Sequence, residues 1–181
     1  EAPNAPCLAR IAGKKDYDDG ILTRMRWIKQ LADQGFATPA GQTTQFVVGA
    51  ADESDQEILT TTSRLYREVG LQRAYFSAFQ PVPNTPLADH PPTPLTREHR
   101  LYQADFLFRQ YSFRLEELIF DAHGHLPLAT DPKLLWAQRH PERFPLEVNT
   151  ASREELLRVP GIGPRAVARL LQWREEGRLR N

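Results

Sequence analysis

Two glycines, Gly161 and Gly163, stand two residues apart in the stretch Val159-Pro160-Gly161-Ile162-Gly163 near the end of the chain. Glycine has no side chain, so a phosphate can approach the backbone closely at these positions. The N–H groups at the start of a following helix point outward and favour an anion. These residue types therefore predict phosphate binding. Because nothing in the turn reads bases, binding should be sequence-independent and salt-sensitive.

Two short helices are expected on either side of this turn. Ser152 and Glu155 have the spacing of a capping box, which starts a helix near Ser152. Pro164 suits the first position of the second helix, and Gly177 suits its end. The segment from Thr150 onward carries seven arginines and four glutamates, a net charge of +3, whereas the whole chain has a net charge of zero. Positive charge is therefore concentrated at this end.

Residues 149–180, with this capping box, V-P-G-I-G turn and basic second helix, resemble the helix-hairpin-helix DNA-binding motif, most closely the single-copy type of competence DNA receptors. The resemblance implies sequence-independent contacts to DNA phosphates. The expected DNA-binding residues are Pro160, Gly161, Ile162, Gly163, Arg165 and Arg169. Ile162 should plug the turn into the helix pair. The alternative is a hairpin that only packs, or that contacts another protein.

The composition of this 181-residue chain excludes several classes of protein and of site. No apolar run is long enough to cross a membrane, and no signal peptide is visible. The single cysteine, Cys7, excludes an intrachain disulfide and a cysteine-only metal site, which fits a cytoplasmic protein. The opening residues EAPN have no leader character, and we expect a start inside a longer protein.

The first half of the chain alternates helix and strand. Helices are expected over 18–33 and 55–69, the second with its own capping box, and strands over 44–48 and 74–79. The expected buried stripe of the first helix is Ile21, Met25, Ile28 and Leu31. This alternation predicts parallel strands joined by crossover helices.

A proline-rich connection, residues 81–94, follows the second strand. Later elements are predicted as a helix over 97–111 capped by Thr96, a helix-like segment over 113–120, a turn at 121–125 and a short helix that starts at Pro132 and ends before Pro141.

The stretches AGQTTQFVVGAADESDQEIL and AYFSAFQPVPNTP resemble the later strands of a radical S-adenosylmethionine barrel, as found in DNA modification/repair radical SAM proteins with a C-terminal helix-hairpin-helix. The resemblance implies an α/β fold with a half-barrel over residues 1–120, a linker with a short helix over 121–148, and an all-α helix-hairpin-helix domain over 149–181. It also implies that Glu1, Gln42, Thr44 and Gln45 face S-adenosylmethionine in an intact barrel. The alternative is that Thr44 and Gln45 are ordinary polar residues of a strand.

One departure from that family is large. Its members hold a [4Fe–4S] cluster with three closely spaced cysteines, and this chain has only Cys7. The chain thus resembles the C-terminal half of such a protein and should be inactive alone. Cluster and S-adenosylmethionine are expected in the full-length parent, and whether this chain is itself part of an enzyme stays open. A cut barrel exposes strand edges, so the chain should pair with the missing half, dimerise, or cover the edge with its own C-terminal helices.

Two other clusters of polar residues have simpler interpretations. Asp121, His123 and His125 are expected to form a solvated loop rather than a metal site. Three acidic residues, Asp52, Glu53 and Asp55, follow the end of a strand. They are expected to cap the following helix rather than act as acid and base.

Overall fold

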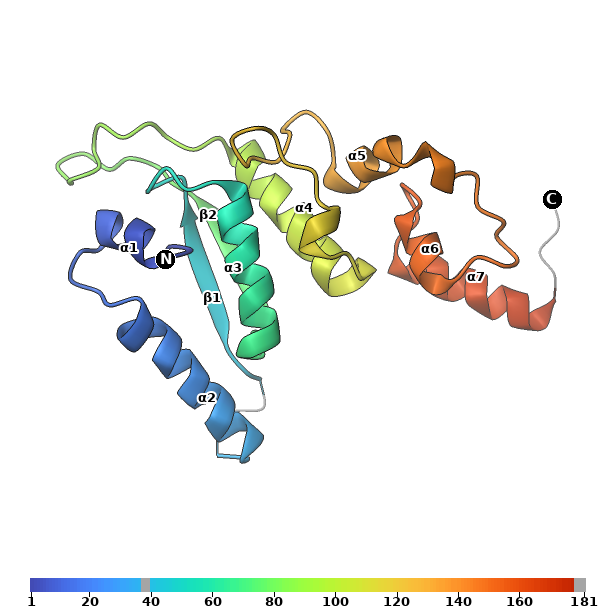
Figure 1. Cartoon of the computed structure of the whole chain (residues 1–181), viewed down its shortest axis with the longest axis horizontal. Helices are drawn as coiled ribbons and strands as arrows, with labels where there is room; N and C mark the ends of the chain where they lie inside the picture. The colour runs from blue at the N-terminus through green and yellow to red at the C-terminus, as the bar shows by residue number, and fades with distance from the viewer. Residues whose placement is uncertain (37–39, 178–181) are drawn as a thin grey trace.

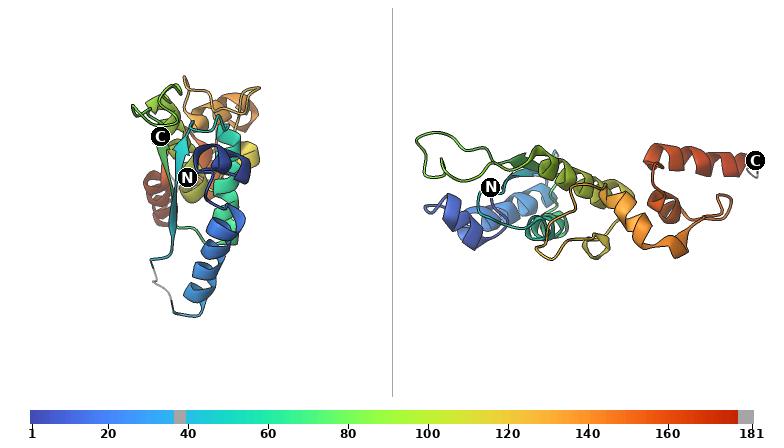
Figure 2. Two further views of the ribbon diagram at one scale, coloured as in Figure 1. Left: turned by 90° about the vertical axis from the view of Figure 1, so that its left-hand side faces the viewer. Right: turned by 90° about the horizontal axis from the view of Figure 1, so that it is seen from above.

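The computed structural model describes residues 1–36 and 40–177. They form a mixed α/β structure with seven α-helices and one two-stranded parallel sheet. The molecule is elongated, with the sheet and the N-terminus in a larger body and the last two helices at the opposite end (Figure 1). Figure 2 shows the same separation from above.

The N-terminal segment holds two helices, α1 (Ala5–Ile11) and α2 (Thr23–Asp33). A π-helical turn, Asp18–Leu22, runs directly into α2, so the helix predicted over 18–33 is confirmed.

The predicted buried stripe of α2 is wrong in its second half. Met25 is buried, but Ile28 and Leu31 are 39% and 46% exposed. Trp27 and Phe36 are also exposed near this end of the helix. Amphipathic spacing identifies a helix, but none of the described residues covers this half of its apolar face.

The sheet consists of β1 (Thr43–Val48) and β2 (Arg73–Ala78), joined by α3 (Asp55–Glu68). The strands are parallel, with Thr43 opposite Arg73, so the predicted strands and crossover helix are confirmed. Ser54 and Glu57 form the predicted capping box at the start of α3.

The next helix, α4 (Leu95–Tyr111), follows the proline-rich connection. It begins earlier than predicted, and its N-cap is Pro94 rather than Thr96, because the Arg97 amide donates to the Pro94 carbonyl. The helix-like segment predicted over 113–120 contains only one 3₁₀ turn, Leu115–Glu117. The flanking Phe113 and Leu118 point into the core, which favours an irregular path over a helix.

The outer edge of β2 is closed by side chains of α3 and α4. Three of its backbone amides donate to side-chain oxygens: Ala74 to Tyr66 at 3.1 Å, Phe76 to Tyr102 at 3.1 Å and Ala78 to Glu98 at 2.7 Å. The chain does cover a strand edge by itself, but with these two helices rather than with its C-terminal ones.

The remaining helices are α5 (Pro132–Arg139), α6 (Arg153–Arg158) and α7 (Pro164–Glu176), with a 3₁₀ turn at Pro141–Arg143. All three α-helices begin where the sequence predicts. The capping box at Ser152 is present, and Gly177 is the C-cap of α7.

The buried apolar residues fall into two clusters. The larger one fills the body and includes Leu126 and Trp136 from the segment predicted as a linker. The smaller one consists of Ala151, Leu156, Leu157 and Val167, with partly buried neighbours, inside the pair α6–α7. Within the described parts of the chain, none of the helices has the length and apolar character that a membrane span requires.

Candidate nucleic-acid interface

The turn between α6 and α7 has the conformation that its glycines suggest. Gly161 is exposed and has φ +80°, in the left-handed region that favours glycine. A Cβ atom built on Gly161 would meet nothing within 4 Å, so the approach to this backbone is open. The Ile162 amide donates to the Val159 carbonyl at 3.2 Å and closes the turn.

Several backbone amides on either side of Ile162 lack acceptors among the described residues. The first intrahelical bond of α7 runs from the Val167 amide to the Gly163 carbonyl at 3.0 Å. No described residue accepts from the amides of Gly161, Gly163 or Arg165. Unpaired amides at the start of a helix favour an anion such as a phosphate.

A buried lysine supports the turn from below. Lys133, at the start of α5, is 8% exposed, and its Nζ donates to the Ile162 carbonyl at 2.6 Å. The same ammonium lies 4.5 Å from the centre of the Tyr111 ring. Burial lowers the pKa of Lys133 to about 8; the Asp131 carboxylate opposes this shift, and the nearby charge of Arg158 adds to it. Positive charge therefore lies directly behind the turn at neutral pH.

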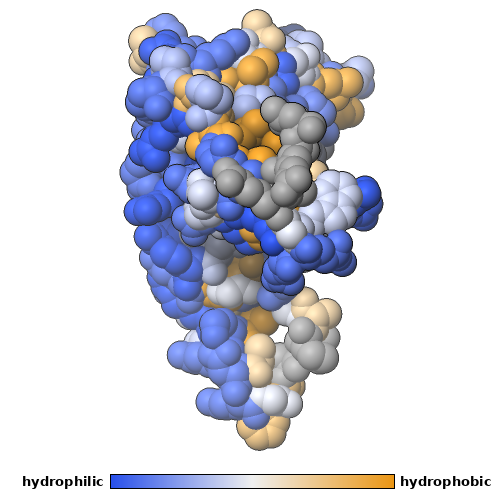
Figure 3. All heavy atoms as spheres, turned by 90° about the vertical axis from the view of Figure 1, so that its right-hand side faces the viewer, coloured by the Kyte–Doolittle hydropathy of each residue, from blue (hydrophilic) through white to orange (hydrophobic). Residues whose placement is uncertain are grey.

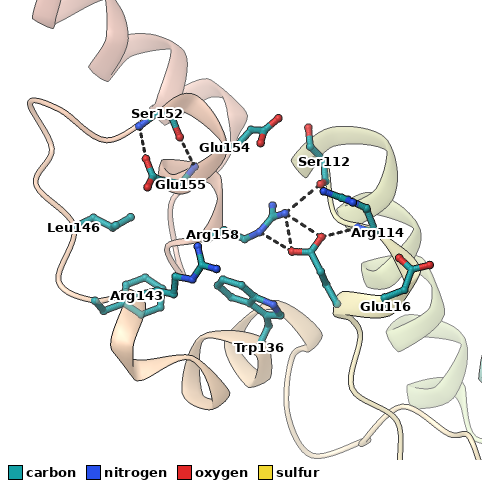
Figure 4. Close-up of a pocket in the computed structure, with 12 residues that line it drawn as sticks. Ser112, Arg114, Glu116, Trp136, Arg143, Leu146, Ser152, Glu154, Glu155 and Arg158 are labelled. Carbon is teal, nitrogen blue, oxygen red and sulfur yellow. Dashed lines mark hydrogen bonds and ion pairs between the residues drawn. The ribbon is translucent and has the colours of Figure 1, made fainter.

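Arg158 joins the hairpin to the body (Figure 4). Its guanidinium binds the Glu117 carboxylate at 2.8 Å and donates to the backbone carbonyls of Tyr111 and Ser112. It also stacks over the Phe113 ring at 3.8 Å. This arginine is consequently a structural residue, although the sequence counts it among the basic residues of the hairpin.

Two other arginines are placed differently. Arg165 and Arg169 are exposed one helical turn apart on α7, and Arg169 lies 5.1 Å from the Trp173 ring centre. Arg174, in contrast, donates to the Ala151 carbonyl at 2.6 Å. The end of the molecule that carries the hairpin presents a mainly hydrophilic surface with hydrophobic patches between (Figure 3).

Four of the six residues predicted to bind DNA line one groove, whereas Arg165 and Arg169 lie outside its lining, on the exposed surface of α7. These four, Pro160, Gly161, Ile162 and Gly163, lie at one end of a groove of about 610 Å³ that Lys133 also lines. Ile162 packs against the small cluster of the hairpin, as its predicted plug position requires.

A larger hollow, about 930 Å³, is lined by Arg158 and is drawn in Figure 4. Four glutamates and three arginines contribute to its wall. Because Arg158 is already paired with Glu117, and Glu155 with the capping box, this hollow is less suited to an anion than the groove at the turn.

The residues predicted to face S-adenosylmethionine do not form one site. The Glu1 carbonyl accepts from the Val47 amide at 3.0 Å, near the carboxyl end of β1. Gln42 lies at the opposite end, where its side chain donates to the carbonyls of Met25 and Val69.

Thr44 and Gln45 lie on opposite faces of β1. Thr44 shares the face of the buried Phe46, whereas Gln45 is exposed on the other face.

The acidic residues after β1 do not cap α3 as expected. The N-cap is Ser54; Glu53 is buried and accepts from the amides of Gly49 and Ala51. Asp55 is fully buried and binds Arg97 of α4 at 2.7 Å. These carboxylates hold the loop and two helices together.

The remaining candidates have structural roles in the described part of the chain. Asp121 accepts from the amides of His123 and His125, which orders the turn. Residues 1–36 and 40–177 contain no group of three His, Cys, Asp or Glu side chains placed to hold a metal ion. Cys7 is buried, and burial raises the pKa of its thiol.

Lys133 and Tyr111 are the site residues that the sequence did not reveal. A single lysine at the start of a short helix has no distinguishing pattern, and its contact with Ile162 spans 29 residues. Comparisons of the chain with protein-family models, with curated proteins and with solved structures gave no match.

Proposed function

We propose that this chain binds DNA through its phosphates, without sequence preference, at the turn between α6 and α7. In this proposal, α6, the turn and α7 form a helix-hairpin-helix, and the body is part of a (β/α) barrel. The observation that carries the proposal is the exposed Gly161 with unpaired amides beside it, at the start of a basic helix.

The charges around the turn support an anionic ligand. Arg165 and Arg169 reach solvent from the same side of α7, and Lys133 lies behind the turn. No side chain here is arranged as a fork that reads base edges, so contacts to the phosphate backbone account best for the arrangement.

The partial barrel has separate support. The two strands are parallel with a helical crossover, and the Glu1 backbone lies along the outer edge of β1. The edge of β2 adds no support, because three of its amides already donate to side chains and are not available to a further strand.

The proposed function of this chain does not include radical chemistry. The one cysteine of the chain is a buried thiol with a raised pKa, which does not fit a thiolate-held cluster. The four residues expected at S-adenosylmethionine also lie at two ends and two faces of β1. An enzymatic role belongs to a parent protein that would supply the cluster loop.

The test is binding of a labelled duplex, followed by fluorescence anisotropy over a range of salt concentrations. The double variant Arg165→Ala/Arg169→Ala should bind more weakly, and the slope of log affinity against log salt should fall by about 1 for each arginine. The double variant Arg24→Ala/Arg26→Ala, which removes two exposed arginines of α2, is the matched control and should bind like the original protein.

An affinity that is equal in all three proteins, or that does not depend on salt, contradicts the proposal. In the second case a protein partner becomes the better candidate, because Trp173 on α7 is 43% exposed and offers an apolar contact.

A further inference from the structure

The groove at the turn extends beyond the residues that a phosphate needs. One wall is α4, whose side chains His99, Gln103 and Phe106 recur at helical spacing on one face. The other wall is the first turn of α5, with Leu134, and the Pro160–Gly163 turn closes one end. Its volume of about 610 Å³ is within the range of small-ligand sites.

The two parts of this groove differ in chemistry. Beside the turn lie the unpaired amide of Gly163 and the ammonium of Lys133, which suit a phosphate. Farther from the turn, two apolar side chains are accessible: Phe106 of α4 is 47% exposed and Leu134 of α5 is 40% exposed. The guanidinium of Arg109 lies 5.0 Å from the Phe106 ring centre, and its charge is balanced by the Asp105 carboxylate at 2.6 Å.

Polar groups are also present along the apolar part. His99 is exposed on α4, one helical turn from Gln103. The Gln103 oxygen accepts from Arg100 at 2.7 Å, which leaves its NH₂ group as a donor. A planar ligand with ring-edge acceptors and an attached phosphate matches this combination.

We propose that the groove binds one unpaired nucleotide of a DNA strand, with its phosphate at the Gly161–Gly163 turn and its base stacked on Phe106. This inference rests on the proposed DNA binding and adds a substrate class to it. Only an unpaired base offers a free ring face, since bases inside a duplex are stacked on their neighbours. The protein should therefore prefer single strands and bulged duplexes over a perfect duplex.

The experiment compares three labelled duplexes of one length by fluorescence anisotropy: a perfect duplex, one with a single bulged thymidine, and one with an abasic bulge at the same place. The original protein should bind the thymidine bulge about tenfold more tightly than either of the others, a size typical of one base stacked on an aromatic ring. The abasic bulge has the same phosphates and the same flexibility, so it isolates the base.

Variant Phe106→Ala should remove the preference and leave perfect-duplex affinity within about twofold. Phe106→Leu keeps an apolar side chain without a ring, and it replaces Phe106→Ala in this test if the alanine variant unfolds. Trp27→Ala removes an aromatic residue of α2 that is 57% exposed and should keep the full preference.

The outcomes separate this inference from the proposed function. Equal affinity for the three probes, or a preference that survives in both Phe106 variants, overturns the nucleotide groove but leaves phosphate binding in place if the arginine variants lower affinity. Absence of DNA binding overturns both.

Discussion

The body and the α6–α7 hairpin are stabilised in different ways. The body has a continuous core that includes Leu8, Ile58 and Leu101, all at most 1% exposed. The described part of the hairpin has a cluster of only four buried apolar residues, too few for such a unit to fold on burial alone. Its position depends on a few contacts with the body: Arg158 and Lys133 each make a polar one, and Tyr111 packs against both hydrophobic clusters.

This difference teaches how a small binding element can be both exposed and ordered. An apolar anchor would need a larger core and would bury the turn. Here Lys133 donates to the Ile162 carbonyl of the hairpin, and Arg158 donates from the hairpin to carbonyls of the body. The amides of Gly161 and Gly163 are left without an acceptor among the described residues. The following changes test that division, from the largest expected effect to the smallest.

The largest effect is expected inside the body, from Arg97→Ala. It leaves the fully buried Asp55 carboxylate without its arginine, and we expect a loss of about 3–5 kcal/mol in the free energy of unfolding. Urea denaturation measures it.

Lys29→Ala is the control, because its ion pair with Asp33 is solvent-exposed and should contribute under about 1 kcal/mol. If the free energy of unfolding falls by less than about 1 kcal/mol in both variants, the buried ion pair does not stabilise the body.

The next change, Arg158→Ala, removes the main anchor of the hairpin. It leaves the partly buried Glu117 carboxylate with the Arg114 amide but without its ion-pair partner, and it loses a stacking contact with Phe113, for an expected cost of about 2–3 kcal/mol. Because the body has its own core, hydrogen exchange should accelerate in α6 and α7 and stay unchanged in α3.

A variant of the partner, Glu117→Gln, keeps a hydrogen-bond acceptor and should have a smaller effect in the same segments. Faster exchange throughout the chain after Arg158→Ala would mean that hairpin and body unfold as one unit.

Features of the fold that depend on neighbouring residues were predictable from the sequence, whereas contacts between residues far apart in the chain were not. Both capping boxes and the helix starts at Pro132 and Pro164 were predicted correctly, because the signals lie within three or four residues. The strands were equally clear from their β-branched and aromatic residues.

The anchors were not predictable, because they join distant parts of the chain. Arg158 lies 41 residues from Glu117, and its sequence context is that of any basic helix end. The exposed half of α2 shows the converse: spacing predicts that Ile28 and Leu31 share a face, but it does not say whether anything covers it. The start of α4 was missed because Thr96 offers a better side-chain cap than Pro94, yet the backbone turns earlier.

A medium effect is expected at Gly161, and the body offers a matched control. Gly161 and Gly35 have φ values of +80° and +78°, and a Cβ atom at either position meets nothing within 4 Å. Replacement by alanine should therefore cost about 1–2 kcal/mol at each site through the same backbone strain.

Only Gly161→Ala should also weaken DNA binding, since only that turn presents amides to a phosphate. The comparison uses urea denaturation for stability and anisotropy for affinity. Equal DNA affinity in the two variants would mean that the turn does not contact DNA.

The smallest effect is a pH dependence at Lys133. Its pKa of about 8 in the free protein should rise when a phosphate binds beside it, so binding takes up protons and affinity should fall as pH rises through about 8. The fall between pH 7 and pH 9 is at most about tenfold, because one group titrates. In Lys133→Arg the charge does not titrate in this range, and the affinity should not depend on pH.

The stability of the free protein should change in the opposite direction. The unfolded chain keeps the lysine proton to higher pH, so the free energy of unfolding should rise over the same range. An affinity that falls equally in Lys133→Arg would place the titrating group elsewhere and leave Lys133 as an anchor alone.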